Sequence, residues 1–165
     1  MRVAELPRII DALRGPIHEF VRESRARIAL VITGSGQVLA QHGFTRSYEV
    51  MNVAALAAAA HAAAGALGKL AGVPRWQHVH HAGADQDLFV ATLQTPVENL
   101  IFVVIFDGES SSLRLVQLFF GRLAHVVSRL PEFAHPVKDM TTQASFERDL
   151  EAGLRRAFLP DSPSQ

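Results

Sequence analysis

The segment from Ala54 to Gly72 constrains the fold most, because it reads AALAAAAHAAAGALGKLAG and consists almost entirely of small side chains. Alanine favours helix more than any other residue, but each alanine buries little apolar surface. His61 and Lys69 interrupt the run, and Gly72 followed by Pro74 should end the helix, which Ser47 or Asn52 could cap. The sequence therefore predicts a long helix that gains little from ordinary core packing.

Two faces of this helix lack charge. The first carries the larger apolar residues, which we expect the protein's own sheet to bury: Val53, Leu56, Ala60, Ala63, Leu67 and Leu70. The opposite face carries small residues and one histidine: Ala54, Ala58, His61, Gly65 and Gly68. Small side chains let another backbone approach closely. The pattern predicts that a second copy or a partner covers this face, where a charged replacement of His61 should break the contact. An alanine-rich genome would give the same composition without such a contact.

Hydrophobic periodicity predicts the other elements. A first helix covers Leu6 to Val21, with a kink or break at Gly15-Pro16. Strands are expected at 27–33, 38–42, 76–83, 87–95 and 100–106, and a further helix follows from Leu113. Short turns between consecutive strands favour antiparallel pairing. We therefore predict an α+β domain over residues 1–130, in which helices sandwich a five-stranded antiparallel sheet.

The C-terminal region differs in composition from the rest of the chain. Residues 131–144 are predicted to form a linker, because proline and polar residues dominate there. An appended amphipathic helix is expected at 145–159, followed by a tail at 160–165. Its apolar residues recur every four positions and mark a possible regulatory helix: Phe146, Leu150, Leu154 and Phe158.

Charge and composition exclude several classes of protein. Lysine plus arginine equals aspartate plus glutamate, so the formal net charge is zero and a strongly basic nucleic-acid binder is not expected. The sequence contains no cysteine, which excludes disulfides and thiol catalysis. The N-terminus lacks the basic-then-apolar pattern of a signal peptide, and the alanine-rich run is only weakly apolar. We expect a cytoplasmic protein with no membrane span.

Histidines form the most conspicuous local motif, HVHH at 78–81. On a strand, His78 and His80 point to one face and His81 to the other, and imidazoles are common ligands of zinc and copper. We find no adjacent carboxylate or cysteine of ligand type, so a strand with polar residues on an exposed or partner-facing side explains the motif equally. A sensor that binds a metal or a small ligand through His78 and His80 is the alternative function.

Other candidate motifs fail in their details. GALGKL at 65–70 resembles the end of a phosphate-binding loop, but Ala63 replaces the first glycine, Leu70 replaces the hydroxyl residue, and the segment lies within a helix. Ser35 in the GSG turn has no identifiable base. We therefore predict no catalytic residue, no cofactor site and no metal site.

The order of these elements resembles the Roadblock family, over residues 5–130. The resemblance rests on RIALVITGSGQVLAQHG, the small-residue helix, VHHAGADQDLFVATLQ and NLIFVVIFDGESSSLRLV. It implies a profilin-like α-β-α fold with an antiparallel sheet. The appended helix is similar to one that bacterial MglB-like members carry beyond the core.

The resemblance also implies partners. MglB-like proteins are homodimers that bind a small Ras-like GTPase, MglA, and stimulate its GTP hydrolysis. In Roadblock dimers the small-residue helix lies beside its symmetry mate and the strand at 76–82 pairs with its mate, which adds Gln77, Val79 and His81 to the expected interface. Such proteins reshape a GTPase that supplies its own catalytic groups. We therefore expect a regulator or scaffold, with no arginine finger at Arg46, Arg75 or Arg114.

Overall fold

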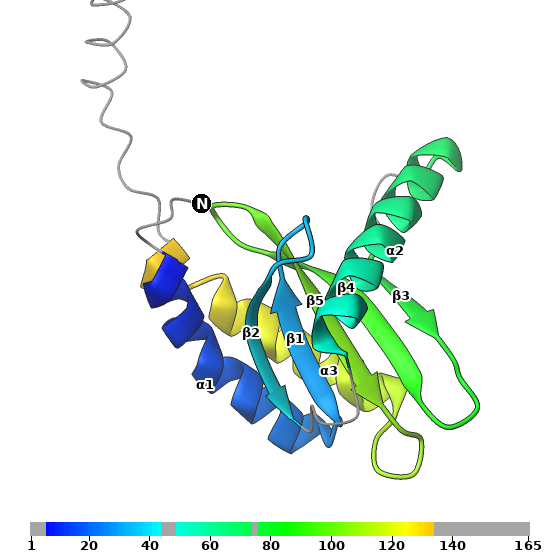
Figure 1. The fold of residues 1–165 in the computed structure, drawn as a ribbon, viewed down its shortest axis with the longest axis horizontal. Helices are drawn as coiled ribbons and strands as arrows, with labels where there is room; N and C mark the ends of the chain where they lie inside the picture. The colour runs from blue at the N-terminus through cyan, green and yellow to red at the C-terminus, as the bar shows by residue number, and fades with distance from the viewer. Residues whose placement is uncertain (1–5, 44–48, 74–75, 134–165) are drawn as a thin grey trace, which may run out of the picture. The chain divides into compact units, whose positions relative to one another are not determined.

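The fold was analysed in a computed structural model that describes residues 6–43, 49–73 and 76–133. Three α-helices, five strands and a short 3-10 helix follow one another in these residues: α1 (Leu6–Ser24), β1 (Ile28–Ile32), β2 (Val38–Gly43), α2 (Val50–Leu70), β3 (His78–His81), β4 (Asp87–Gln94), β5 (Asn99–Phe106), α3 (Leu113–Val127) and η1 (Pro131–Phe133). The predicted α+β class and the order of elements are confirmed (Figure 1).

The five strands form one antiparallel sheet in the order β2-β1-β5-β4-β3. β5 is central and reads NLIFVVIF, which is apolar on both faces because helices cover both. α1 and α3 lie side by side on one face, and α2 crosses the other (Figure 1). The two edges of the sheet are therefore β2 and β3.

Alternate residues of each strand point to opposite faces of the sheet, where they belong to two separate hydrophobic cores. The core beneath α1 and α3 holds the large aromatic side chains, and Phe20 meets Phe102 edge-on at a centroid distance of 4.8 Å. The core beneath α2 contains aliphatic side chains of the sheet and only alanines among the buried residues of the helix. The two helical layers therefore contact the sheet through side chains of very different size.

A polar turn after β5 connects three elements. Arg27 Nε lies 2.6 Å from Asp107 Oδ2, and the Ser110 amide and hydroxyl both donate to Asp107 Oδ1. These hydrogen bonds, with the nearby guanidinium, lower the pKa of Asp107 to about 2. Ser111 donates its hydroxyl to the Ser24 carbonyl at the end of α1. The turn thus ties the end of α1 and the start of β1 to the end of β5.

Several predicted boundaries were wrong in detail. α1 continues through Pro16 as one helix, and β3 covers only His78–His81. The predicted linker begins too early, because Phe133 is fully buried in the core beneath α1 and α3. α2 begins after Glu49, whose side chain receives a hydrogen bond from Asn52 instead of capping the helix. Ser112 caps α3, because its side chain accepts a hydrogen bond from the Leu115 amide.

Candidate functional site

The small face of α2 lies against the protein's own sheet, so the prediction that Leu56, Leu67 and Leu70 pack on the sheet was wrong. Ala54 is fully buried and Ala58 nearly so, in the core formed with β1, β4 and β5. The half-buried His61 hydrogen-bonds through Nε2 to Thr92 Oγ1 of β4 over 2.8 Å. Gly65 and Gly68 lie beside the Trp76 ring, which is 3.7 and 3.6 Å from the position of an added Cβ. Ala54, Ala58 and His61 therefore attach the N-terminal half of the helix to its own sheet, whereas the two glycines face Trp76.

The size of the sheet residues explains this orientation. The face of the sheet beneath α2 is already filled by large aliphatic side chains: Ile28, Leu30, Ile32, Val90, Ile101 and Val103. A helix bearing leucines on the same side would be held away from the strands, whereas alanines allow close packing. Even the β1–β2 turn approaches closely, since an added Cβ on Gly36 would lie 3.2 Å from the Ala55 Cα.

Val50 and Val53 are half-buried against the core beneath α2, whereas the other larger apolar residues of α2 face outward. Met51, Leu56, Leu67 and Leu70 are 68%, 71%, 66% and 87% exposed, respectively. Exposed alanines lie between them, and Asn52 and Lys69 are the polar residues in this part of the helix. We call the set Met51, Leu56, Leu67 and Leu70 the outer face of α2. A contiguous apolar surface of this kind is typical of an interaction site.

The outer face could not be predicted from helical periodicity, which assigns the leucines of α2 to the core. On a helical wheel both sides of α2 lack charge, so the wheel could not decide which side meets the sheet. Large side chains on the sheet and small ones on the helix together indicate that the small face of α2 meets the sheet. This indication is usable only when it is known that the two elements pack together.

The C-terminal half of α2 receives little support from the domain. All three buried residues, Ala54, Ala57 and Ala58, lie before His61, and none follows it in the helix. This half extends beyond the strands (Figure 1). A helix of 21 residues spans about 31 Å, whereas five-residue β1 spans about 17 Å. A short isolated helix is marginally stable in water, so this half gains most from a covering partner.

Length and composition would also allow α2 to cross a membrane. It is the one helix with this property among the residues that the structure describes. Alanine is only weakly apolar, and the helix packs on the sheet through Ala54, Ala57 and Ala58. These features do not make α2 a clear membrane span.

The edge strand β3 places part of its side chains on the face of the sheet that α2 covers. Val79 pairs with Val90, and His81 pairs with Leu88, so both side chains stand on the α2 face of the sheet. Val79 is half-buried, whereas Gln77 and His81 are exposed. An uncovered edge strand offers unpaired backbone groups to another strand. The role of Gln77, Val79 and His81 in an interface stays a prediction.

His78 and His80 share the opposite face, as their spacing predicts, but each has its own partner. His78 Nε2 lies 3.0 Å from Gln117 Nε2 of α3, and its ring stacks on Phe89. His80 Nε2 lies 2.8 Å from Asp87 Oδ2, an interaction that contributes most to the lowered pKa of Asp87. No cluster of three or more metal-ligating side chains occurs in the described ranges. Because each of these histidines has its own partner, the geometry gives no support to a metal site shared by His78 and His80.

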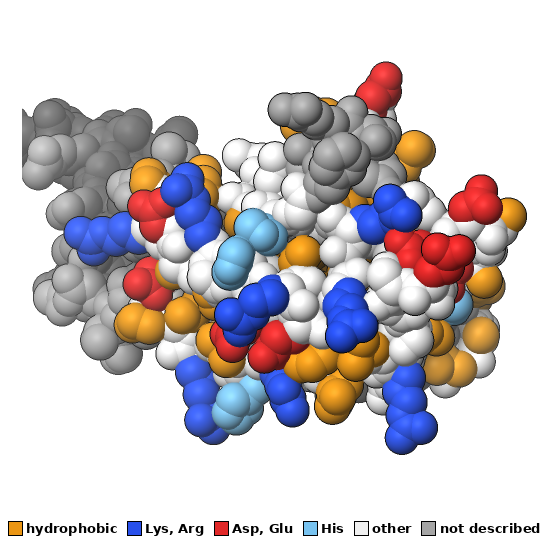
Figure 2. Space-filling view, turned by 90° about the horizontal axis from the view of Figure 1, so that it is seen from below, with side chains coloured by type: hydrophobic (Ala, Val, Ile, Leu, Met, Phe, Trp, Pro, Cys, Tyr) orange, Lys and Arg blue, Asp and Glu red, His pale blue; other side chains and the backbone are white. Residues whose placement is uncertain are grey.

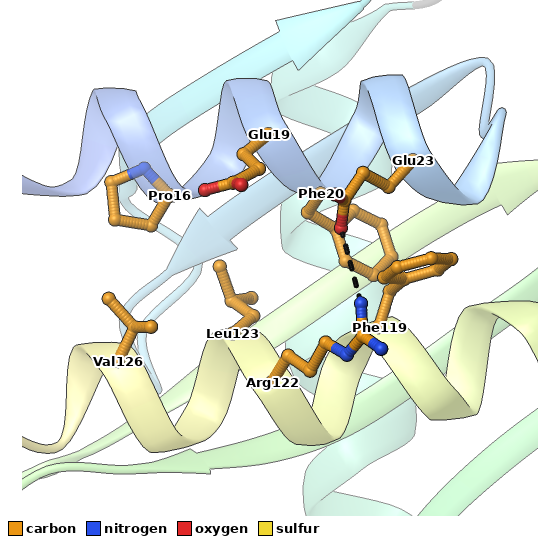
Figure 3. Close-up of a pocket in the computed structure, with 8 residues that line it drawn as sticks. All are labelled: Pro16, Glu19, Phe20, Glu23, Phe119, Arg122, Leu123 and Val126. Carbon is orange, nitrogen blue, oxygen red and sulfur yellow. Dashed lines mark ion pairs between the residues drawn. The ribbon is translucent and has the colours of Figure 1, made fainter.

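A groove lies between α1 and α3 on the opposite side of the sheet. It measures about 210 Å³, and its floor includes Phe20 and Leu123. Glu23 lies 3.8 Å from Arg122, whose guanidinium also covers the Phe119 ring (Figure 3). Seen from below, hydrophobic side chains gather between charged groups of both signs (Figure 2). Arg122 is therefore occupied by contacts within the domain.

Of the remaining candidates, those that the structure describes do not form a catalytic set. Ser35 is exposed and forms a hydrogen bond with Thr33 across 2.8 Å, which belongs to the β1–β2 turn. Arg114 is exposed on α3. Arg46 and Arg75 lie outside the described residues, as do the residues of the expected regulatory helix: Phe146, Leu150, Leu154 and Phe158.

Known proteins share this architecture. The solved structure of MglB from Myxococcus xanthus superposes with a TM-score of 0.71 at 24% identity, covering 79% of this chain and 95% of that one. The gliding protein MglB from Thermus thermophilus is 31% identical, with a TM-score of 0.60 and coverages of 78% and 92%. A structure described as MglB with a tetrameric arrangement is 32% identical, with a TM-score of 0.64 and coverages of 82% and 96%. No curated protein matches the sequence.

The family assignment rests on sequence as well as on shape. The Roadblock/LC7 domain matches residues 17–106, which extend from the middle of α1 to the end of β5. Relatives above 30% identity are covered along almost their whole length. The chain therefore belongs to the Roadblock/LC7 family and has MglB proteins among its structural relatives.

Proposed function

We propose that this protein is a cytoplasmic homodimeric regulator that binds a small Ras-like GTPase and stimulates its GTP hydrolysis. The observation that carries the proposal is the outer face of α2, an uncharged apolar surface on a fold shared with MglB proteins. The resemblance to MglB-like members implies a partner GTPase of this kind. The regulator would bind and reshape its partner, because the described residues contain no assembled catalytic group of their own.

The proposed dimer is isologous, so that the same surface of both copies meets around a twofold axis. Antiparallel pairing of two α2 helices would cover Leu56, Leu67 and Leu70 of each copy. The β3 edge could extend the sheet into the second copy. Each buried leucine side chain contributes roughly 1.5–3 kcal/mol relative to exposure to water, which is enough for the outer face to dominate association. A structure described as a tetrameric arrangement of MglB supports self-association in relatives.

The partner is tested by direct binding. The full chain is mixed with an MglA-like GTPase loaded with GDP or with a non-hydrolysable GTP analogue, and the complex is isolated by size exclusion. We expect a complex that depends on the nucleotide, together with faster GTP hydrolysis when the two proteins are combined. Equal binding to both nucleotide states with no change in hydrolysis would reject the regulatory proposal.

An arginine variant separates reshaping from direct catalysis. Arg114→Ala removes an exposed arginine from α3 without disturbing a buried contact. If the regulator acts by reshaping its partner, this variant retains full stimulation. A loss of stimulation of about 10³-fold with unchanged binding would instead identify Arg114 as an arginine finger.

A further inference from the structure

We propose that His18 and His42 form a chelating site for a divalent transition-metal ion at the β2 edge of the sheet. His18 Nδ1, on α1, lies 3.0 Å from His42 Nε2, on β2. The ring centroids are 4.5 Å apart, and the ring planes meet at 77°. Two imidazoles that are distant in sequence are therefore held with one nitrogen of each directed at the other.

The fold determines this arrangement. His42 pairs with Ala29 of β1, a residue of the core beneath α1 and α3, so His42 stands on the same face of the sheet. His18 directly follows the fully buried Ile17 and lies at the rim of α1. Packing of α1 along β2 then brings the two rings together. Both backbones belong to regular elements, which hold a site more firmly than loops do.

The separation of the two nitrogens matches adjacent positions around one metal ion. Imidazole nitrogens bind zinc at about 2.0–2.1 Å, so two of them at angles of about 90–109° are about 2.8–3.4 Å apart. The observed 3.0 Å falls within this range. At present one ring donates a hydrogen to the other. A metal ion would replace that hydrogen, and the donating ring would carry its proton on its other nitrogen, so that both ligands stay neutral.

The surroundings leave room for the ion and for water ligands. An open groove of about 640 Å³ runs between α1 and β2, and both histidines line it. Arg14 is the other charged residue in the lining, and its Nε lies 3.6 Å from Asp11. With two protein ligands and several waters, the site should follow the general order of divalent affinities, in which Cu²⁺ binds most tightly and Ni²⁺ and Zn²⁺ less so.

The site is independent of the proposed interface. β2 and β3 are opposite edges of the sheet, and the histidine pair lies on the face that α1 covers, away from α2. Each copy of a dimer formed through α2 would therefore keep one open site. A bound ion would join α1 to the edge strand β2 and stabilise the contact between them.

Metal titration of the full chain, purified without a histidine tag and treated with a chelator, tests the proposal. CuCl₂, NiCl₂ and ZnCl₂ are titrated separately by calorimetry, and the Cu²⁺ complex is examined by electron paramagnetic resonance. We expect one strong Cu²⁺ site per chain with hyperfine splitting from two imidazole nitrogens. His18→Ala and His42→Ala should each weaken binding at least tenfold and remove one nitrogen from the spectrum.

His125→Ala serves as the matched control, because His125 is an exposed histidine near the end of α3. It should bind Cu²⁺ as the unchanged protein does. Circular dichroism and sedimentation verify that each variant keeps its fold and association state. Binding that changes less than twofold in both pair variants, or that falls equally in the control, would overturn the proposal and leave the pair as a hydrogen bond only.

Discussion

His61 Nε2 lies 2.8 Å from Thr92 Oγ1, and this hydrogen bond joins the small face of α2 to strand β4. The His61 ring also lies 4.8 Å from the Trp76 ring, measured between centroids. Both contacts lie within one chain. A charged replacement of His61 would therefore damage the packing of α2 on its own sheet, contrary to the expectation that it would break only a contact with another molecule.

The protonation of His61 should make stability depend on pH. Burial lowers the pKa of His61 below its ordinary value of about 6.5. The unfolded chain therefore binds a proton at a higher pH than the folded chain, and stability is lost as the pH falls through this range. Urea unfolding at pH 7.5 and 5.5 should show a smaller decrease for His61→Gln than for the unchanged protein. An equal decrease in both proteins would contradict this role of His61.

Gly65 and Gly68 should respond oppositely to alanine, although both lie on the small face of α2. An added Cβ on Gly65 meets Trp76 Nε1 at 3.7 Å, an ordinary contact, so helix propensity should raise the free energy of unfolding by about 0.5–1 kcal/mol. An added Cβ on Gly68 would lie 2.7 Å from the Val73 carbonyl oxygen. Thermal unfolding should show stabilisation by Gly65→Ala and destabilisation by Gly68→Ala. Stabilisation by both substitutions would contradict this prediction, because it would show that the Val73 carbonyl can move away without lowering the free energy of unfolding.

Asp107 should contribute to stability as a carboxylate. Its pKa of about 2 is depressed by the Ser110 hydrogen bonds and by Arg27. This contribution is complete above the ordinary carboxyl pKa of about 3.9 and is lost as the pH falls towards 2. Asp107→Asn should therefore lower the free energy of unfolding at pH 7, and the difference from the unchanged protein should shrink between pH 5 and 2. A difference that is constant with pH would show that charge is not the cause.

Much of the fold could be predicted from the sequence. The apolar run of β5, the periodicity of α3 and the serine cap at Ser112 are local features, and local features determine where elements begin and end. Pro16 did not mark a helix boundary, because α1 continues through it. A proline removes one backbone hydrogen bond from a helix, and packing of the helix on the core can offset that loss. Phe133 follows a proline in a polar segment, and only the assembled core reveals its burial.

The interaction surface could not be predicted in the same way. Whether Leu56 or Ala58 faces the sheet depends on the volume of residues such as Ile101 and Val103, which come much later in the chain. The convergence of His18 with His42 likewise depends on how α1 packs along β2. Such relationships are set by tertiary packing, and helical periodicity contains no information about them.

Sedimentation velocity of an outer-face variant tests the central claim most directly. Leu56→Arg combined with Leu67→Arg places two charges on the outer face of α2, where neither side chain supports the domain. Leu118→Arg combined with Val126→Arg is the matched control, because these α3 residues are also exposed apolar side chains, at 54% and 46%. At micromolar concentration we predict a dimer or larger assembly for the unchanged protein and the control, and a folded monomer for the outer-face variant. A monomeric unchanged protein, or an outer-face variant that still associates, would contradict the account.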